Sequence, residues 1–131
     1  MIDKSILTEL YKTDPELIEK FHVCHGQGLE KCVERTYNDL LVAETEYLYN
    51  GTDVIGYYSL ERSPYGTFLS GFFIKPAYRK DQIKWEEIYN NLPLNTYCGL
   101  YTCNKRAIRF FEKKNYNKIS DFLDSFIFQI K

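Results

Sequence analysis

Residues 74–85 read IKPAYRKDQIKW and form the segment with the clearest chemical potential. The pattern predicts the end of a buried strand, a turn, and the start of a helix. Such a junction suits an anion such as phosphate, because free backbone N–H groups and the helix dipole point out of it. Turns that hold a phosphate closely usually contain glycine, and this turn has none. The segment is therefore a phosphate site of unusual sequence or the remnant of one.

A second group of residues has the composition of a metal site. His22, Cys24 and His25 are near neighbours, and Cys32 follows after two glycines. Zinc needs three or four ligands that converge tetrahedrally. On a helix His22 and His25 share a face while Cys24 points elsewhere, which favours packed cysteines and polar histidines near a helix end. We predict no metal site, although the sequence leaves open whether these four residues bind metal.

Thiols and carboxylates offer two further kinds of reactive group. Cys98 or Cys103 could be a nucleophile, but nothing in the sequence places a base beside either, and a buried structural cysteine is the favoured interpretation. Glu44, Glu46 and Glu61 lie on or beside predicted strands, where a carboxylate could deprotonate an amine. Solvent-facing strand residues are the simpler interpretation. The sequence therefore names no catalytic residue.

Twelve tyrosines stand out in the composition. Those that could stack on bases are Tyr47, Tyr49, Tyr57, Tyr58, Tyr65 and Tyr78. On a chain with a net charge of −1 they favour half-buried strand faces and a protein interface. We therefore expect a protein partner or a homo-oligomer, and no binding to nucleic acid.

The elements that must position these residues follow from periodicity and turn signals. Asp14-Pro15 predicts the start of a first helix, and glycines separate it from a second helix over 29–40. Asn50-Gly51 predicts a hairpin, and Gly71 suggests a bulge or a close backbone approach inside a central strand. Further predicted elements are strands at 42–50, 53–61 and 67–75, a helix at 83–92, a strand at 95–103, a helix at 104–116, and strands at 117–120 and 124–131. The order ααβββαβαββ indicates one α+β domain, residues 1–131, with a mixed and mostly antiparallel sheet.

Length and charge narrow the class of protein. A chain of 131 residues can bury a real core. It carries no evident export signal and no apolar run of membrane-spanning length, so we expect no membrane and no secretion. The four cysteines are then expected to be reduced thiols in an intracellular compartment.

Two segments resemble the GNAT family, the Gcn5-related N-acetyltransferases, and the element order resembles it over residues 14–131. IKPAYRKDQIK is similar to the family's strand-to-helix segment, which leads into Gln/Arg-x-x-Gly-x-Gly/Ala. NKRAIRFFEKKNY is similar to its later helix, Asn-x-x-Ala-x-x-x-Tyr-x-x-x-Gly-Phe. The resemblance implies a GNAT-like fold and a site for acetyl-CoA.

The turn departs from the family pattern at its two small residues. Arg79 and Ile83 stand in register, but Gln82 and Lys84 occupy those two positions. In the family, glycine lets the backbone N–H groups approach the pyrophosphate of acetyl-CoA. We expect the long side chains of Gln82 and Lys84 to crowd the place where the phosphates would lie.

The later helix keeps the residues that serve the fold and lacks the acid. Asn104 and Ala107 are retained, and Asn115-Tyr116 replaces Gly-Phe. Asn104 is also the expected N-cap of this helix, and Asn115 can take the left-handed conformation that ends it. The family's tyrosine, which protonates the leaving thiolate, falls at Phe111, which has no proton to donate. Taken together, the retained and the replaced residues resemble a GNAT scaffold with a degenerate acetyl-CoA site.

Two functions follow as hypotheses. The favoured one is a non-catalytic structural or protein-interaction role without a cofactor, in the cytoplasm or as a component of a phage virion. The alternative is an acetyl-CoA-dependent N-acyltransferase acting on an amine, with pantetheine along residues 72–74. For that case the resemblance implies the cofactor-binding residues Phe73, Ile74, Arg79, Ile83, Lys84 and Asn104.

Overall fold

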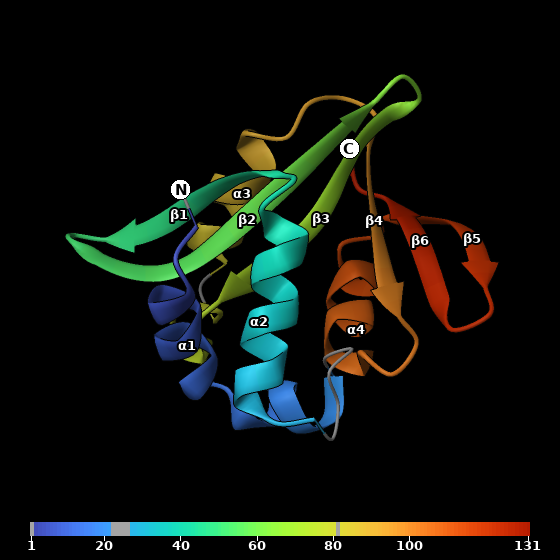
Figure 1. Cartoon of the computed structure of the whole chain (residues 1–131). Coiled ribbons are helices and arrows are strands. Elements are labelled where there is room, and N and C mark those ends of the chain that lie inside the picture. Colours follow the sequence, from blue (N-terminus) through green and yellow to red (C-terminus); the bar gives the residue numbers. More distant parts are fainter. Residues whose placement is uncertain (1, 22–26, 81) are drawn as a thin grey trace.

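A computed structural model describes residues 2–21, 27–80 and 82–131 of the chain. Within these residues it contains four α-helices, a short π-helix, a short 3-10 helix and six strands (Figure 1). The π-helix η1 follows α1, and the 3-10 helix η2 follows β3. In chain order the elements are α1 Lys4–Lys12, η1 Leu17–Phe21, α2 Leu29–Leu40, β1 Glu44–Asn50, β2 Asp53–Ser63, β3 Gly66–Ile74, η2 Pro76–Tyr78, α3 Ile83–Asn90, β4 Thr96–Tyr101, α4 Lys105–Lys113, β5 Asn117–Phe122 and β6 Ser125–Gln129.

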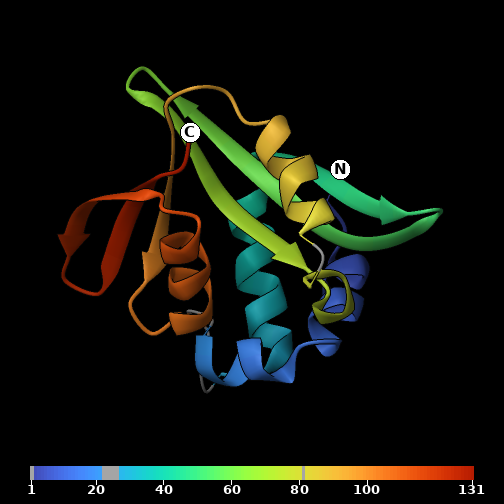
Figure 2. The same ribbon diagram turned by 180° about the vertical axis from the view of Figure 1, so that it is seen from behind.

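The six strands form one mixed sheet in the order β1-β2-β3-β4-β6-β5. Strands β1 to β3 make the predicted antiparallel meander, and β4, β6 and β5 are also antiparallel. Of the described strands, only β3 and β4 run parallel, and their pairing is limited to Thr67 with Thr96 and Phe68 with Tyr97. Beyond these two pairs the strands diverge (Figures 1 and 2). The predicted α+β class with a mixed sheet is confirmed.

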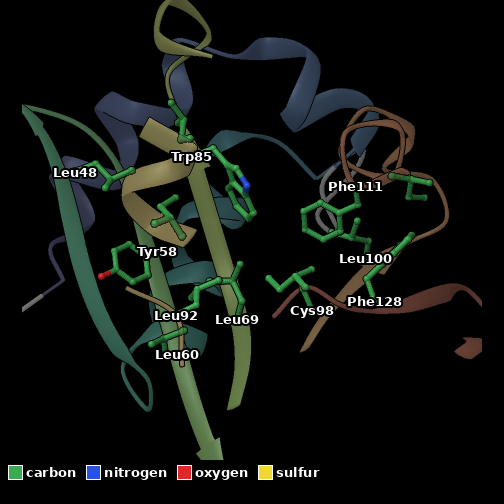
Figure 3. Packing of buried hydrophobic residues seen from close by; sticks show 14 of the residues in the cluster. Leu48, Tyr58, Leu60, Leu69, Trp85, Leu92, Cys98, Leu100, Phe111 and Phe128 are labelled. Atoms are coloured by element: carbon green, nitrogen blue, oxygen red, sulfur yellow. The ribbon is translucent and has the colours of Figure 1, made fainter. Parts of the chain in front are cut away.

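Each face of the sheet carries its own pair of helices and its own core (Figures 1 and 2). Helices α1 and α2 pack on one face, where Leu7, Val33 and Phe73 are buried. Helices α3 and α4 pack on the other, around Trp85 and Phe111 (Figure 3). The sheet is thus covered on both sides, and the gap between β3 and β4 lies between the two layers of helices.

The predicted helix start at Asp14-Pro15 is confirmed, but a helix that was not predicted precedes it. The first helix is α1, which begins after Asp3, whose side chain accepts a hydrogen bond from the Ser5 backbone N–H at 2.7 Å. Its buried residues Leu7, Leu10 and Tyr11 follow helical spacing, a pattern that the sequence-based prediction missed. Asp14-Pro15 opens, as predicted, a short helical segment that contains the π-helix η1.

The predicted bulge in β3 is confirmed. Ser59 of β2 pairs with Gly71 and Leu60 pairs with Leu69, so Ser70 is the extra residue. The hydroxyl groups of Ser59 and Ser70 lie 2.9 Å apart. A bulge bends the strand that carries it and leaves one residue out of the ladder. It therefore lies at the stretch where β3 turns away from β4.

Candidate functional site

A cleft of about 570 Å³ opens where β3 and β4 diverge. Its walls are strand residues 69–74 of β3 and 98–101 of β4. Residues from both layers of helices complete it, so the cleft passes from one face of the sheet to the other. These residues are Tyr11, Leu17, Arg35, Thr36, Asp39 and Leu40 on the α1–α2 side, and Tyr78, Gln82, Trp85, Asn104, Arg106, Ala107 and Phe110 on the α3–α4 side, with Tyr57 of β2. Arg79 follows β3, and its guanidinium lies over the Phe73 ring of the α1–α2 core.

The charge of the cleft differs from that of the whole chain. Arg35, Arg79 and Arg106 line it, and Asp39 is the one carboxylate among the described lining residues. The whole chain carries a net charge of −1. Positive charge is therefore concentrated at the cleft, which suits an anionic ligand.

Asp14 forms ion pairs that connect three segments distant in sequence, beside this cleft. Its carboxylate, only 4% exposed, accepts hydrogen bonds from Arg79 Nη2 at 2.8 Å and from Arg106 Nη2 at 2.6 Å. Arg79 also donates through Nε to the Ile74 carbonyl at 2.6 Å. Burial raises the pKa of Asp14, but hydrogen bonds from Arg106 and Arg79 and their charges outweigh it and hold this pKa below its usual value. The carboxylate therefore stays ionised between two arginines.

The turn before α3 keeps a glycine-like backbone without glycine. Gln82 is the N-cap of α3 and lies in the left-handed region at φ 60°, a conformation that glycine adopts most easily. Its side chain lines the cleft, and its Oε1 accepts a hydrogen bond from Lys114 Nζ. The long side chain of Gln82 therefore lies beside the cleft, as expected.

Lys84 behaves differently from the expectation. Its ammonium donates to the Tyr49 carbonyl at 2.7 Å, at the far end of β1, and also pairs with Glu87 at 3.5 Å. Neither Lys84 nor the 59% exposed Ile83 belongs to the cleft lining. The expected crowding by Lys84 is therefore wrong, since its side chain extends away from the cleft.

Helix α4 presents its retained residues to the cleft and buries the position of the missing acid. Asn104 caps the helix by accepting a hydrogen bond from the Ala107 backbone N–H at 3.3 Å, as predicted, and both residues line the cleft. Phe111 is fully buried, with ring centroids 5.8 Å from Trp85 and 5.4 Å from Phe128 (Figure 3). It serves the core and does not line the cleft.

A group of buried hydroxyls on the α1–α2 side was not predicted. The hydroxyl oxygens of Tyr11 and Tyr57 lie 2.6 Å apart, and that of Tyr11 donates to Thr36 Oγ1 at 3.4 Å. Burial, and then the neighbouring Tyr11, raises the pKa of Tyr57 well above its usual value. These neutral hydroxyls come from α1, α2 and β2, and they were missed because α1 itself was not predicted.

Four of the six residues predicted to bind the cofactor lie together. Phe73, Ile74, Arg79 and Asn104 line the cleft, whereas Ile83 and Lys84 do not. A role for any of them in binding a cofactor stays a prediction.

The other candidate residues are dispersed. Glu44 pairs with Arg62 at 3.2 Å, and Glu44, Glu46 and Glu61 all lie outside the cleft lining. Cys98 lines the cleft, but burial raises the pKa of its thiol to about 12, so the thiol is protonated at neutral pH. Cys103 is exposed.

The candidate metal ligands lie partly outside the residues that the structure describes. His22, Cys24 and His25 lie outside them, and Cys32 is buried in the core of the α1–α2 face. Within residues 2–21, 27–80 and 82–131 no three His, Cys, Asp or Glu side chains gather as a metal site would need. None of the helices described there has the length and apolar character to cross a bilayer.

No protein-family model matches the sequence, and comparison with curated proteins found no significant match. Solved structures do resemble the fold. An acetyltransferase from Thermus thermophilus gives a TM-score of 0.73 at 17% identity, covering 96% of this chain and 88% of that one. PaiA N-acetyltransferase from Thermoplasma acidophilum, solved in complex with coenzyme A, gives 0.69 at 15% identity, with 96% and 91% covered. A GNAT-family protein from Desulfovibrio desulfuricans gives 0.68 at 11% identity, with 96% and 90% covered. The chain therefore has the GNAT fold.

Proposed function

We propose that this protein binds a coenzyme A thioester in the cleft between β3 and β4 and transfers the acyl group to an amine. One observation carries the proposal: the cleft is lined from both faces of the sheet. Two substrates could enter from opposite faces and meet beside the bulge at Ser70. The neighbour from Thermoplasma acidophilum, whose structure contains coenzyme A, supports the choice of ligand.

The residues of the cleft fit the ligand in shape and charge. Among the described strands, residues 69–73 of β3 have no partner on the side of β4, so backbone groups there can bond the amides of pantetheine. The N-terminus of α3, together with Arg79 and Arg106, suits the phosphates. Asn104 and the small Ala107 would line the pantetheine arm from the α4 side.

The reaction requires little from the protein beyond positioning and proton transfer. Bound thioester supplies an activated acyl group. The amine nitrogen forms a bond to the carbonyl carbon, the C–S bond breaks, and the thiolate leaves. Phe111 cannot protonate this thiolate, so its proton must come from water. Asp39 is the one described lining carboxylate that could accept the proton of the amine.

A non-catalytic role is the second candidate, and Phe111 is the observation that favours it. The position of the family's acid lies inside the aromatic core of α3 and α4, where it contributes to packing alone. A protein with this core could bind a thioester, or a protein partner, without turnover. A place in a phage virion stays a prediction within this second candidate.

Binding is the first quantity to measure. Calorimetric titration with acetyl-CoA should give saturable binding, and a thousandfold excess over Kd would stabilise the fold by about 4 kcal/mol. Ala107→Leu should abolish binding, because it places a larger side chain in the cleft. Arg109→Leu, on the exposed face of the same helix, is the matched control. A flat titration of the unmodified protein at millimolar ligand would contradict the proposal.

Turnover separates the two candidates. Loss of thioester absorbance in the presence of amines reports acyl transfer. This readout is preferable to a thiol reagent, since the exposed Cys103 would react with such a reagent. Binding without turnover on any amine would favour the non-catalytic candidate.

A further inference from the structure

Two opposite charges on α2 face the cleft. Arg35 and Asp39 are exposed, lie four residues apart, and both line the cleft. No hydrogen bond or ion pair involves either side chain within the described part of the chain. Residues four apart are neighbours on a helix surface, so the two groups lie side by side. Their order, with the cation nearer the N-terminus, is the less favourable one for pairing with each other.

The inner side of the same helix packs against the bulge in β3. A Cβ placed on Gly71 would lie 3.6 Å from Leu40 and 3.7 Å from the Tyr57 ring. Thr36, one turn earlier, meets the buried hydroxyl of Tyr11. Arg35 and Asp39 directly precede these two buried residues in sequence, so they border the cleft where β3 bends away from β4.

The two charges lie across the sheet from the residues suited to the thioester. Asn104 and Ala107 line the cleft from α4, on the opposite face. The floor below α2 offers only neutral hydroxyls, from Tyr11, Thr36 and Tyr57. On this face an acceptor would therefore meet the Arg35 guanidinium and the Asp39 carboxylate. The Arg79 guanidinium also reaches this face, over the Phe73 ring, but it is already paired with Asp14.

We propose, resting on the acyltransferase function above, that the acceptor is an amino acid, an amine that carries its own carboxylate. The Arg35 guanidinium would hold the carboxylate, since its planar donors match two carboxylate oxygens. Asp39 would bind the ammonium, which loses one proton to water and so becomes the nucleophilic amine. Asp39 would then take the second proton, which the nitrogen loses as the C–N bond forms. The C–S bond then breaks, and the leaving thiolate takes a proton from water. A diamine without a carboxylate would place a second cation beside Arg35 and is disfavoured.

A panel of matched acceptors tests the proposal with acetyl-CoA as donor. Glycine, glycinamide and putrescine differ in the charge at the end remote from the reacting amine. We expect glycine to have the highest kcat/KM, by about 10- to 100-fold over glycinamide, which is the value of a charge-assisted hydrogen bond. Arg35→Gln should remove this preference by raising KM for glycine while leaving glycinamide unchanged. Asp39→Asn should lower kcat for both acceptors.

The controls separate this proposal from the one on which it rests. Glu34→Gln changes an exposed charge of α2 outside the cleft lining and should change none of these values. Equal or faster turnover of glycinamide or putrescine would overturn the amino-acid proposal and leave acyl transfer intact. An equal loss of kcat/KM for all three acceptors in Arg35→Gln would also overturn the amino-acid proposal and leave acyl transfer intact. Failure of acetyl-CoA to bind would instead overturn both.

Discussion

Asp14 joins segments of the chain that lie far apart in sequence. It accepts hydrogen bonds from Arg79 and Arg106, which are 65 and 92 residues away. The loop after β3, the start of α4 and the segment before η1 therefore meet at one carboxylate. From the sequence, Asp14 was predicted only as a helix cap. Its ion pairs with Arg79 and Arg106 could not be predicted, because they depend on tertiary structure.

Asp14→Asn should destabilise the protein in a pH-dependent way. At neutral pH we expect the free energy of unfolding to fall by about 1–3 kcal/mol, because two half-buried guanidinium groups lose their charged partner. The pKa of Asp14 is lowered in the folded state, so its stabilising effect is complete above the unfolded value of about 3.9. It is lost as the pH falls through the folded-state pKa.

Urea unfolding of both proteins over a range of pH measures this difference. The two unfolding curves should converge as the pH falls below about 4. Asp121→Asn, at an exposed position of β5, is the control and should change little at any pH. A gap between wild type and Asp14→Asn that persists undiminished in acid would contradict the ionic origin of the effect.

Gln82 holds a backbone conformation that suits glycine. Gln82→Gly should raise the free energy of unfolding by about 1 kcal/mol, since glycine adopts φ 60° without the Cβ penalty. Gln82→Ala keeps the penalty and loses the same exposed hydrogen bond to Lys114, so it should give no gain. Thermal unfolding of the pair isolates the backbone effect. If the Gln82 side chain obstructs the cleft, both variants should also bind acetyl-CoA more tightly than wild type.

At the scale of elements, caps and turns were predicted correctly because they depend mainly on residues that are near neighbours in sequence. The N-cap Asn104, the left-handed Asn115 and the hairpin at Asn50-Gly51 were all found as predicted. Helix α1 was not predicted because Asp14-Pro15 is the stronger local signal for a helix start. The direction of Lys84 could not be predicted, since it depends on the Tyr49 carbonyl of β1.

Strands β2 and β3 approach closely at Gly56, which supports the wall of the cleft. A Cβ on Gly56 would lie 2.2 Å from the Phe73 carbonyl oxygen, an atom of a paired strand that has little room to move. Gly56→Ala should therefore cost at least about 2 kcal/mol of unfolding free energy. In contrast, a Cβ on Gly71 makes contacts of 3.4 to 3.7 Å, so Gly71→Ala should cost less than about 1 kcal/mol.

Chemical denaturation of these two strand variants makes the comparison direct. The same substitution is made in neighbouring strands of one sheet, so intrinsic strand propensity largely cancels. Similar losses of stability in both would show that the short distance at Gly56 relaxes without cost.

For the whole molecule, the arrangement of the strands decides where chemistry can occur. Two residue pairs join β3 to β4, and the ion pairs of Asp14 connect the loop after β3 with α4. Between these connections the cleft passes through the sheet. The order of elements was predictable from periodicity, but the cleft was not, because it depends on where two strands stop pairing.

The uneven distribution of charge also affects how a ligand reaches the cleft. Three arginines line the cleft, two of them paired with Asp14, on a chain that is slightly negative as a whole. A polyanion in solution is therefore drawn toward the opening and repelled by much of the remaining surface, which speeds its productive encounters. Since this attraction acts over roughly 8–10 Å at physiological ionic strength, added salt slows association more than it speeds release.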